Sequence, residues 1–159
     1  MRTLPHLRLV IVASSAAMAR IRVPDNVEVR LDTPLAEATN IIAHSRFMAL
    51  PLRDAEVPCG HVTLVSAMHL GKAIVVTRSS GVADYVQDGV TGLYAEPHDP
   101  QSLARAIDAF ASDPGQRDRL GESGRRFARE HCMEDNAVAY FDRFLKLRAA
   151  SPPASIRSA

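Results

Sequence analysis

The residues with the clearest chemical potential form a small-residue turn and the helix start that we expect after it, Cys59-Gly60-His61-Val62-Thr63. The first N–H groups of a helix lack partners within the helix, and the helix dipole adds positive potential at the same end. Such an end is suited to a phosphate or another anion. We therefore take Gly60, His61, Val62 and Thr63 as candidate ligand-binding residues, with a plain tight turn into a core helix as the alternative.

A second candidate loop, Arg78-Ser79-Ser80-Gly81, follows the apolar run Ala73-Ile74-Val75-Val76 and Thr77. The flexible glycine and the backbone amides beside it can face a ligand, and Arg78 is the natural partner for an anion. We take Arg78, Ser80 and Gly81 as candidate site residues. A structural turn is again the alternative.

The elements around these loops explain why they should lie together. Apolar residues recur at close to helical spacing from Val62 to Leu70, and Gly71 stands where a helix C-terminal glycine belongs. The apolar run that follows predicts a buried strand, and then come a short helix over 82–87 and a strand over 91–95. Both candidate loops thus occupy strand-to-helix junctions, where open α/β sheets bind their ligands.

The rest of the chain continues this alternation. Further strands are expected at 7–12, 27–31 and 47–52. Further helices are expected at 34–45, 100–112, 116–131 and 133–149, the first two capped by Thr33 and Asp99. The order predicts an α/β fold, a Rossmann-like parallel sheet with helices on both faces. Residues 1–150 should form one domain, and residues 151–159 a flexible tail too poor in apolar side chains to fold.

The composition is typical of a soluble globular protein, with 159 residues, 47% of them hydrophobic and 23% charged. A net charge of +1 gives the whole molecule no attraction to nucleic acid or to an anionic membrane. No apolar run approaches the roughly 18 residues of a transmembrane segment. A signal peptide over residues 1–19 is an alternative to the first strand, but Ser14 and Ser15 interrupt its apolar run.

Other patterns favour no additional site. Cys59-x-His61 has too few neighbouring ligands for zinc, so we predict no metal. The two cysteines, Cys59 and Cys132, are far apart in sequence and predict reduced thiols in the cytoplasm. The arginines between 117 and 129 alternate with acidic residues, which is typical of a solvated helix face, and we expect no nucleic-acid partner.

An ordered series of residues resembles the donor-nucleotide half of retaining, two-domain (GT-B type) glycosyltransferases of the large group 1 family. The similarity extends from about residue 8 to about residue 140. The residues that carry it are Ala67-Met68, Gly71-Lys72, Val75-Val76-Thr77, Gly81-Val82, Asp84-Tyr85-Val86, Asp88-Gly89, Thr91-Gly92-Leu93 and Asp99-Pro100.

The resemblance implies transfer of a hexose from a nucleotide-sugar, a UDP- or GDP-hexose, to a saccharide or lipid hydroxyl, without a metal or another cofactor. It implies that residues 60–63 hold the diphosphate, that Ser66 holds the ribose, and that Ser80 and Gly81 lie beside the sugar. It further implies polysaccharide biosynthesis in the cytoplasm, where attachment to the surface of the inner membrane is left open. The catalytic residues stay unassigned.

The chain departs from the family pattern in two ways. The family's two signature glutamates fall on Pro58 and Ser66, and a neutral hydrogen bond from a serine is weaker than one to a carboxylate. Glu56 is an alternative sugar contact by another loop path. The acceptor-binding half and the opening strand of the donor half, which usually supplies an arginine and a lysine, have no counterpart in the sequence, and Arg53 is an alternative source of positive charge.

We therefore expect a donor-binding domain that is inactive as an isolated chain and needs a separate acceptor-binding domain or subunit. The alternative is a non-catalytic module for nucleotide binding or for protein interaction, with an eroded donor site. An unrelated flavodoxin-like receiver domain is a further alternative. It would need an acidic cluster at the strand ends, and the sequence has none.

Overall fold

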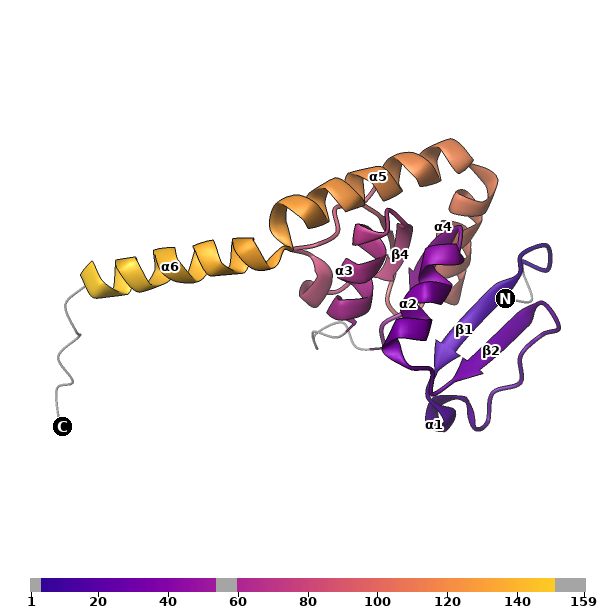
Figure 1. Ribbon diagram of the computed structural model, residues 1–159. Coiled ribbons are helices and arrows are strands. Elements are labelled where there is room, and N and C mark those ends of the chain that lie inside the picture. Colours follow the sequence, from indigo (N-terminus) through magenta and orange to yellow (C-terminus); the bar gives the residue numbers. More distant parts are fainter. Residues whose placement is uncertain (1–3, 54–59, 151–159) are drawn as a thin grey trace, which may run out of the picture.

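The computed structural model describes residues 4–53 and 60–150, and it has strands alternating with helices along most of that length (Figure 1). The strands are β1 (Leu9–Ala13), β2 (Val27–Leu31), β3 (Phe47–Leu50), β4 (Ala73–Thr77) and β5 (Leu93–Ala95). The α-helices are α1 (Ser15–Met18), α2 (Leu35–His44), α3 (His61–His69), α4 (Pro100–Ser112), α5 (Pro114–His131) and α6 (Glu134–Ala150), and η1 (Ser80–Val82) is a 3₁₀ turn. The predicted α/β fold with parallel strands is confirmed.

The strands form two parallel ladders where the alternation predicted one sheet. One ladder pairs β1 with β2, and the other has the order β3-β4-β5. Within the described residues no backbone ladder joins the two. Local patterning predicts the existence of a strand but not its neighbour, so this division could not be read from the sequence.

Strand β4 is the centre of the hydrophobic core, and all five of its residues are buried. Ile74 and Val76 face a cluster that contains Leu64 and Met68 of α3. Ala73 and Val75 face a second cluster built on helix α4, where Ile107 and Phe110 are buried. Helices therefore cover both faces of this sheet, which explains why the strand is a continuous apolar run.

Local capping signals fix the starts of α4 and α5 and the end of α3. Asp99 Oδ1 accepts the N–H groups of Gln101 (2.9 Å) and Ser102 (3.0 Å), and Asp113 Oδ1 accepts that of Gln116 (2.8 Å). Both caps precede a proline at the first helical position, as predicted for Asp99. Gly71 follows α3 with a φ of +68°, which confirms its predicted role as the C-terminal glycine.

Several predicted boundaries differ from the structure: β1 is Leu9–Ala13 rather than 7–12, β3 ends at Leu50 rather than at 52, β5 begins at Leu93 rather than at 91, and α5 begins at Pro114 rather than at 116. Two further predictions are wrong for local reasons. Helix α2 is capped by Pro34 rather than by Thr33, because the extended ψ of Pro34 (148°) delays the helix by one residue, and the Pro34 carbonyl accepts the first helical bond. The helix predicted over 82–87 is a single 3₁₀ turn, η1, followed by hydrogen-bonded turns. Thr91 Oγ1 accepts the Gln87 N–H (2.9 Å) and so ties this segment into a turn.

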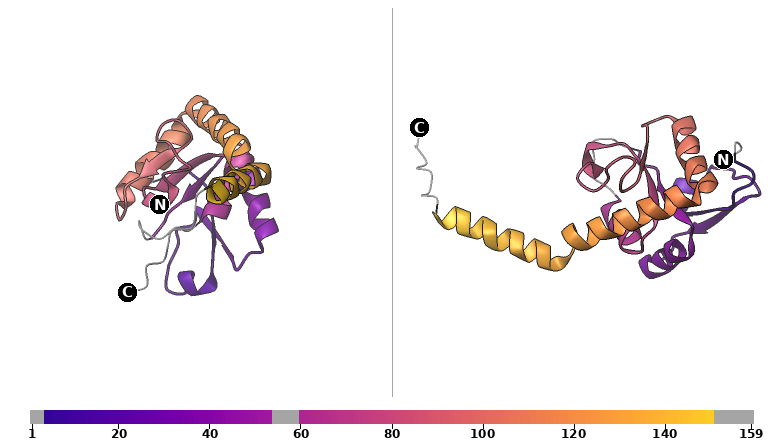
Figure 2. Two further views of the ribbon diagram at one scale, coloured as in Figure 1. Left: turned by 90° about the vertical axis from the view of Figure 1, so that its left-hand side faces the viewer. Right: turned by 90° about the horizontal axis from the view of Figure 1, so that it is seen from above.

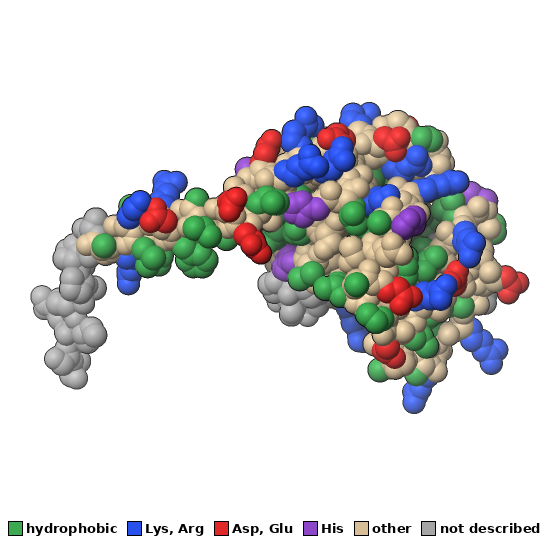
Figure 3. Space-filling model, viewed as in Figure 1, with side chains coloured by type: hydrophobic (Ala, Val, Ile, Leu, Met, Phe, Trp, Pro, Cys, Tyr) green, Lys and Arg blue, Asp and Glu red, His purple; other side chains and the backbone are tan. Residues whose placement is uncertain are grey.

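Helix α6 extends away from the rest of the molecule (Figures 1 and 2). Hydrophobic side chains along it face solvent (Figure 3). They are Val138, Tyr140, Phe141, Phe144, Leu145 and Leu147, each between 47% and 67% exposed. Basic and acidic side chains are interspersed over α5 in the same figure, and Arg119, Arg126 and Arg129 are exposed, as predicted. Arg117 departs from the prediction, because its side chain is only 16% exposed and donates to the Phe110 carbonyl (3.3 Å).

Among the helices in residues 4–53 and 60–150, none has the length and the apolar character needed to cross a membrane.

Candidate functional site

The two candidate loops lie at the carboxyl ends of β3, β4 and β5. Arg78, directly after β4, donates its backbone N–H to the carbonyl of Ala95 at the end of β5 (2.8 Å). Leu52, just after β3, donates its backbone N–H to Thr77 Oγ1 at the end of β4 (2.9 Å). These bonds hold the segments after all three strands against one edge of the sheet, which is the edge at which α/β folds bind ligands.

Helix α3 begins at this edge with Gly60 as its N-cap. Gly60 has a φ of +76°, and a Cβ built on it would lie 3.0 Å from Leu50 Cδ2, so glycine alone suits both the backbone and the space. Within the described residues no side chain caps this helix start, and its first turn contains no acidic residue. Its first N–H groups and the positive end of its dipole are therefore available to an anion. Val62 is 65% exposed here.

His61 joins the two loops. Its Nε2 lies 2.6 Å from the Gly81 carbonyl oxygen, and since a carbonyl can only accept, Nε2 carries the proton. The imidazole also packs on the Tyr85 ring with 5.1 Å between centroids. The side chain of His61 is thus used in placing the second loop against the start of α3.

Ser79, which the sequence analysis did not select, has the least satisfied side chain of the site. The residue is only 7% exposed, and its Oγ makes no hydrogen bond to any described residue. A buried hydroxyl without a partner is destabilising, so it deserves a functional explanation. Of the neighbouring pair Ser79-Ser80, the sequence offered no means to tell which hydroxyl points inward.

Arg78 is engaged by groups of the protein itself. Its Nε lies 2.9 Å from Glu96 Oε1 and its Nη2 lies 3.5 Å from Asp88 Oδ2, while its guanidinium stacks 4.4 Å above the centre of the Tyr94 ring. The hydrogen bond to Glu96 raises the pKa of Arg78 above its usual range. A bound anion would have to compete with these two carboxylates, so the predicted role of Arg78 stays a prediction.

The remaining candidates are placed as follows. Ser66 lies on α3 one turn after Val62, on the face that Val62 and Thr63 share at helical spacing. Arg53, the alternative source of positive charge, is exposed. Lys72 donates from Nζ to the Ser45 carbonyl (2.9 Å) at the end of α2, a structural role at a helix C-terminus. Glu56, Pro58 and Cys59 lie outside the described residues.

The turn at Asp88-Gly89 beside the site is structural. Asp88 Oδ1 accepts the Tyr94 N–H (2.9 Å), and Gly89 has a φ of +72° that favours glycine. No three His, Cys, Asp or Glu side chains in the described part of the chain lie close enough together to hold a metal ion.

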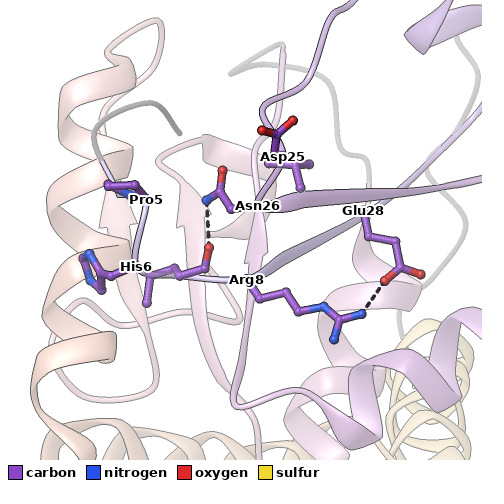
Figure 4. Close-up of a pocket in the computed structure, with 8 residues that line it drawn as sticks. Pro5, His6, Arg8, Asp25, Asn26 and Glu28 are labelled. Atoms are coloured by element: carbon purple, nitrogen blue, oxygen red, sulfur yellow. Dashed lines mark hydrogen bonds and ion pairs between the residues drawn. The ribbon is translucent and has the colours of Figure 1, made fainter.

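A hollow of about 540 Å³ lies at the opposite edge, at the amino ends of β1 and β2 (Figure 4). Its polar groups bind one another: Arg8 pairs with Glu28 (2.9 Å), and Asn26 Nδ2 donates to the carbonyls of Leu4 (3.2 Å) and Leu7 (2.7 Å). These contacts hold the segment before β1 in place. His6 and Asp25 also line the hollow, and His6 Nε2 lies 3.8 Å from Asp108 Oδ1.

The family model described as glycosyl transferases group 1 matches residues 14–127. This chain belongs to the group 1 glycosyltransferase family. It is 25% identical over 128 residues to a D-inositol 3-phosphate glycosyltransferase of Thermobifida fusca, covering 78% of this chain and 29% of that protein. It is 35% identical over 106 residues to the lipopolysaccharide core biosynthesis glycosyltransferase LpsE of Rhizobium meliloti, covering 64% of this chain and 28% of that protein.

Two solved structures share the fold. Sucrose-phosphate synthase from Thermosynechococcus elongatus aligns with a TM-score of 0.72 at 21% identity, over 91% of this chain and 39% of that one. Anabaena Alr3699/HepE in complex with UDP-glucose aligns with a TM-score of 0.71 at 17% identity, over 94% of this chain and 44% of that one. The chain spans less than a third of the length of these two curated relatives and less than half of these two structures.

Proposed function

We propose that this chain is the donor-binding domain of a group 1 glycosyltransferase and that it binds a nucleotide-sugar at the carboxyl edge of the β3-β4-β5 sheet. The observation that carries the proposal is the hydrogen bond from His61 Nε2 to the Gly81 carbonyl, which brings the uncapped start of α3 beside the loop after β4. The related HepE structure, described as a complex with UDP-glucose, supports a nucleotide-sugar as the ligand class.

In this proposal backbone groups, rather than charged side chains, provide most of the electrostatic stabilisation of the bound diphosphate. The free N–H groups and the dipole at residues 60–63 stabilise the negative charge of the diphosphate as the bond between sugar and phosphate breaks. Ser66, one turn along α3, binds a ribose hydroxyl. Ser80 and Gly81 approach the sugar, which is transferred to an acceptor hydroxyl. No residue of this chain is assigned as a catalytic acid or base, and no metal or further cofactor takes part.

The proposal includes a second domain or subunit that binds the acceptor, so the purified chain alone should show little or no transferase turnover. It also keeps the assignment of residues 1–150 to one donor-binding domain, and cytoplasmic polysaccharide biosynthesis as the setting. Hexose transfer from UDP- or GDP-hexose remains the preferred reaction.

Two observations favour a second candidate function. The charge of Arg78 is already neutralised by Glu96 and Asp88, and no carboxylate is available at position 66 for the ribose. Both features fit a binding module that has lost transfer activity and retains nucleotide or protein recognition.

Thermal unfolding in the presence of UDP, GDP, ADP and their hexose conjugates tests the proposal. A ligand at a hundred times its dissociation constant should stabilise the fold by about 2.7 kcal/mol. Ser66→Ala should weaken the effect of the active nucleotide, whereas Ser112→Ala, at the exposed end of α4, should leave it unchanged. If no nucleotide at millimolar concentration shifts the unfolding temperature, the chain does not bind a donor by itself and the proposal fails in this form.

A further inference from the structure

Helix α3 begins with backbone donors that have no partner inside the helix. Its first hydrogen bond runs from the Leu64 N–H to the Gly60 carbonyl (2.9 Å), which leaves the N–H groups of His61, Val62 and Thr63 without an intrahelical acceptor. Helices in general have such donors at their start, so these groups do not by themselves define a ligand. A specific ligand needs a further polar group beside the helix start.

Ser79 provides an unused polar group of this kind. The residue is 7% exposed, and its Oγ is closed to solvent and makes no hydrogen bond to any described residue. Ser79 is also the N-cap of η1, a position from which a serine hydroxyl commonly accepts an N–H two or three residues later, but it does not do so here. The hydroxyl therefore serves neither the local turn nor a distant described residue.

The backbone determines the side to which Ser79 points. Ser79 is extended, with a φ of −151° and a ψ of 156°, and successive side chains alternate along an extended backbone. The preceding residue, Arg78, places its guanidinium over the Tyr94 ring (4.4 Å). The side chain of Ser79 therefore lies on the other side of the chain, the side on which Thr77 Oγ1 makes its hydrogen bond.

That side leads to the start of α3. Thr77 Oγ1 accepts the N–H of Leu52 (2.9 Å), just after β3, and a Cβ built on Gly60 would lie 3.4 Å from Leu52 Cδ2. The bond from His61 to the Gly81 carbonyl holds the loop after β4 against the same helix start. The unused hydroxyl of that loop and the first N–H groups of α3 thus belong to one site.

Turning the hydroxyl of Ser79 to a ligand costs the protein no hydrogen bond. A serine side chain has three staggered positions, related by rotation about its Cα–Cβ bond. In its present position Oγ has no partner among the described residues, so it gives up no such bond when it rotates toward a ligand between the two loops. A hydrogen bond to the ligand also removes the destabilisation that an unpaired buried hydroxyl causes.

We propose that Ser79 Oγ donates a hydrogen bond to the second phosphate of the ligand, so that the site selects nucleoside diphosphates over monophosphates. This inference rests on the proposed function, because it names a further residue of that same donor site. The start of α3 binds one phosphate through its N–H groups, and the loop after β4 contributes Ser79 to the next. Backbone N–H groups and a hydroxyl can all donate, and hydrogen bonds to an ionised phosphate are about twice as strong as those between neutral groups.

Isothermal titration calorimetry of the full chain tests this proposal with UDP, GDP and ADP and with the three corresponding monophosphates. Ser79→Ala should weaken binding of the preferred diphosphate about tenfold to a hundredfold, the contribution of one hydrogen bond to a charged group. The affinity for the monophosphate should stay unchanged. In phosphorus NMR spectra the substitution should move the β-phosphate resonance of the bound ligand more than the α-phosphate resonance.

Two further variants make the result specific. Ser79→Thr keeps the hydroxyl and suits an extended backbone, so it should retain most of the preference for the diphosphate. Ser112→Ala, at an exposed position of α4, should change neither affinity. Stability is an independent readout, because Ser79→Ala should be more stable than the wild type without ligand, whereas truncation of a residue that only supports the fold would lower stability.

The possible outcomes separate this inference from the proposed function. If the wild type binds a diphosphate and Ser79→Ala binds it equally well, Ser79 has no such role and the donor site stands. Equal weakening of diphosphate and monophosphate would make Ser79 structural, and weakening of the nucleotide-sugar alone would place the hydroxyl on the sugar; either result overturns the inference. If no nucleotide binds to the wild type, the proposed function fails and this inference fails with it.

Discussion

The Nε2 atom of His61 donates a hydrogen bond of 2.6 Å to the carbonyl oxygen of Gly81, twenty residues further along the chain. This bond joins the first residue of α3 to the loop after β4, and both belong to the candidate donor site. The position of one loop relative to the other therefore depends on the side chain of His61.

Replacing His61 by phenylalanine should separate this bond from the ring contact. Phe keeps a ring against Tyr85 but cannot donate to Gly81, so the free energy of unfolding should fall by about 1 kcal/mol. Exchange of the amides in residues 79–83 should become faster, and nucleotide binding should weaken. His69→Phe, in the last turn of the same helix, is the matched control. Equal effects of the two substitutions would remove the special role of His61.

Ser79→Ala should stabilise the free protein. The substitution removes a buried hydroxyl that has no partner among the described residues, and such a group is destabilising by about 1–3 kcal/mol. Chemical denaturation measures the change, and Ser112→Ala, at an exposed position, should have no comparable effect. If the hydroxyl serves a bound nucleotide, the more stable variant should also bind it more weakly. A loss of stability in the free protein would show that Ser79 Oγ has a partner.

Gly121→Ala should be strongly destabilising. Helix α5 passes so close to the end of α3 that a Cβ at this position would collide with the Gly71 carbonyl oxygen and would lie 3.1 Å from the Ala73 nitrogen. Overpacking of this kind costs about 1–3 kcal/mol or more, because backbone cannot move aside. Gly89→Ala is a useful comparison, since its Cβ would meet nothing and only the strain of φ +72° remains, about 1 kcal/mol. Denaturant unfolding should therefore give a lower free energy of unfolding for Gly121→Ala than for Gly89→Ala.

Asp99 should make stability depend on pH in the acid range. The Ser102 N–H, the largest cause, and the Gln101 N–H hold the pKa of Asp99 below its usual value. A carboxyl whose pKa is lower in the folded state contributes stability above its unfolded pKa, and this contribution is lost as the pH falls through the folded pKa. Asparagine also caps helices but does not titrate. The stability difference between the wild type and Asp99→Asn should thus shift against the wild type as the pH is lowered, and a constant difference would contradict the prediction.

The contacts that sequence reasoning predicted correctly depend on neighbours within a few residues. Asp99 caps α4 through the next three residues, and Gly71 ends α3 by its own backbone angle. What it missed depends on distant partners. Arg78 was selected for its position after a strand, but Glu96, eighteen residues later, binds its guanidinium. The inward direction of Ser79 and the bond from His61 to Gly81 likewise depend on how separate loops pack. The division of the strands into two ladders also depends on contacts between residues that are distant in the sequence.

The exposed apolar side chains of α6 determine how this protein should respond to heat. A helix of 17 residues that gains little from packing is close to the limit at which isolated helices persist in water. Its backbone should therefore lose helical content gradually over a broad range of temperature, while the sheet and its covering helices unfold in one cooperative transition at a higher temperature. Far-ultraviolet circular dichroism should show a sloping change before the main transition, and a chain that ends before α6 should lack that slope and keep the transition.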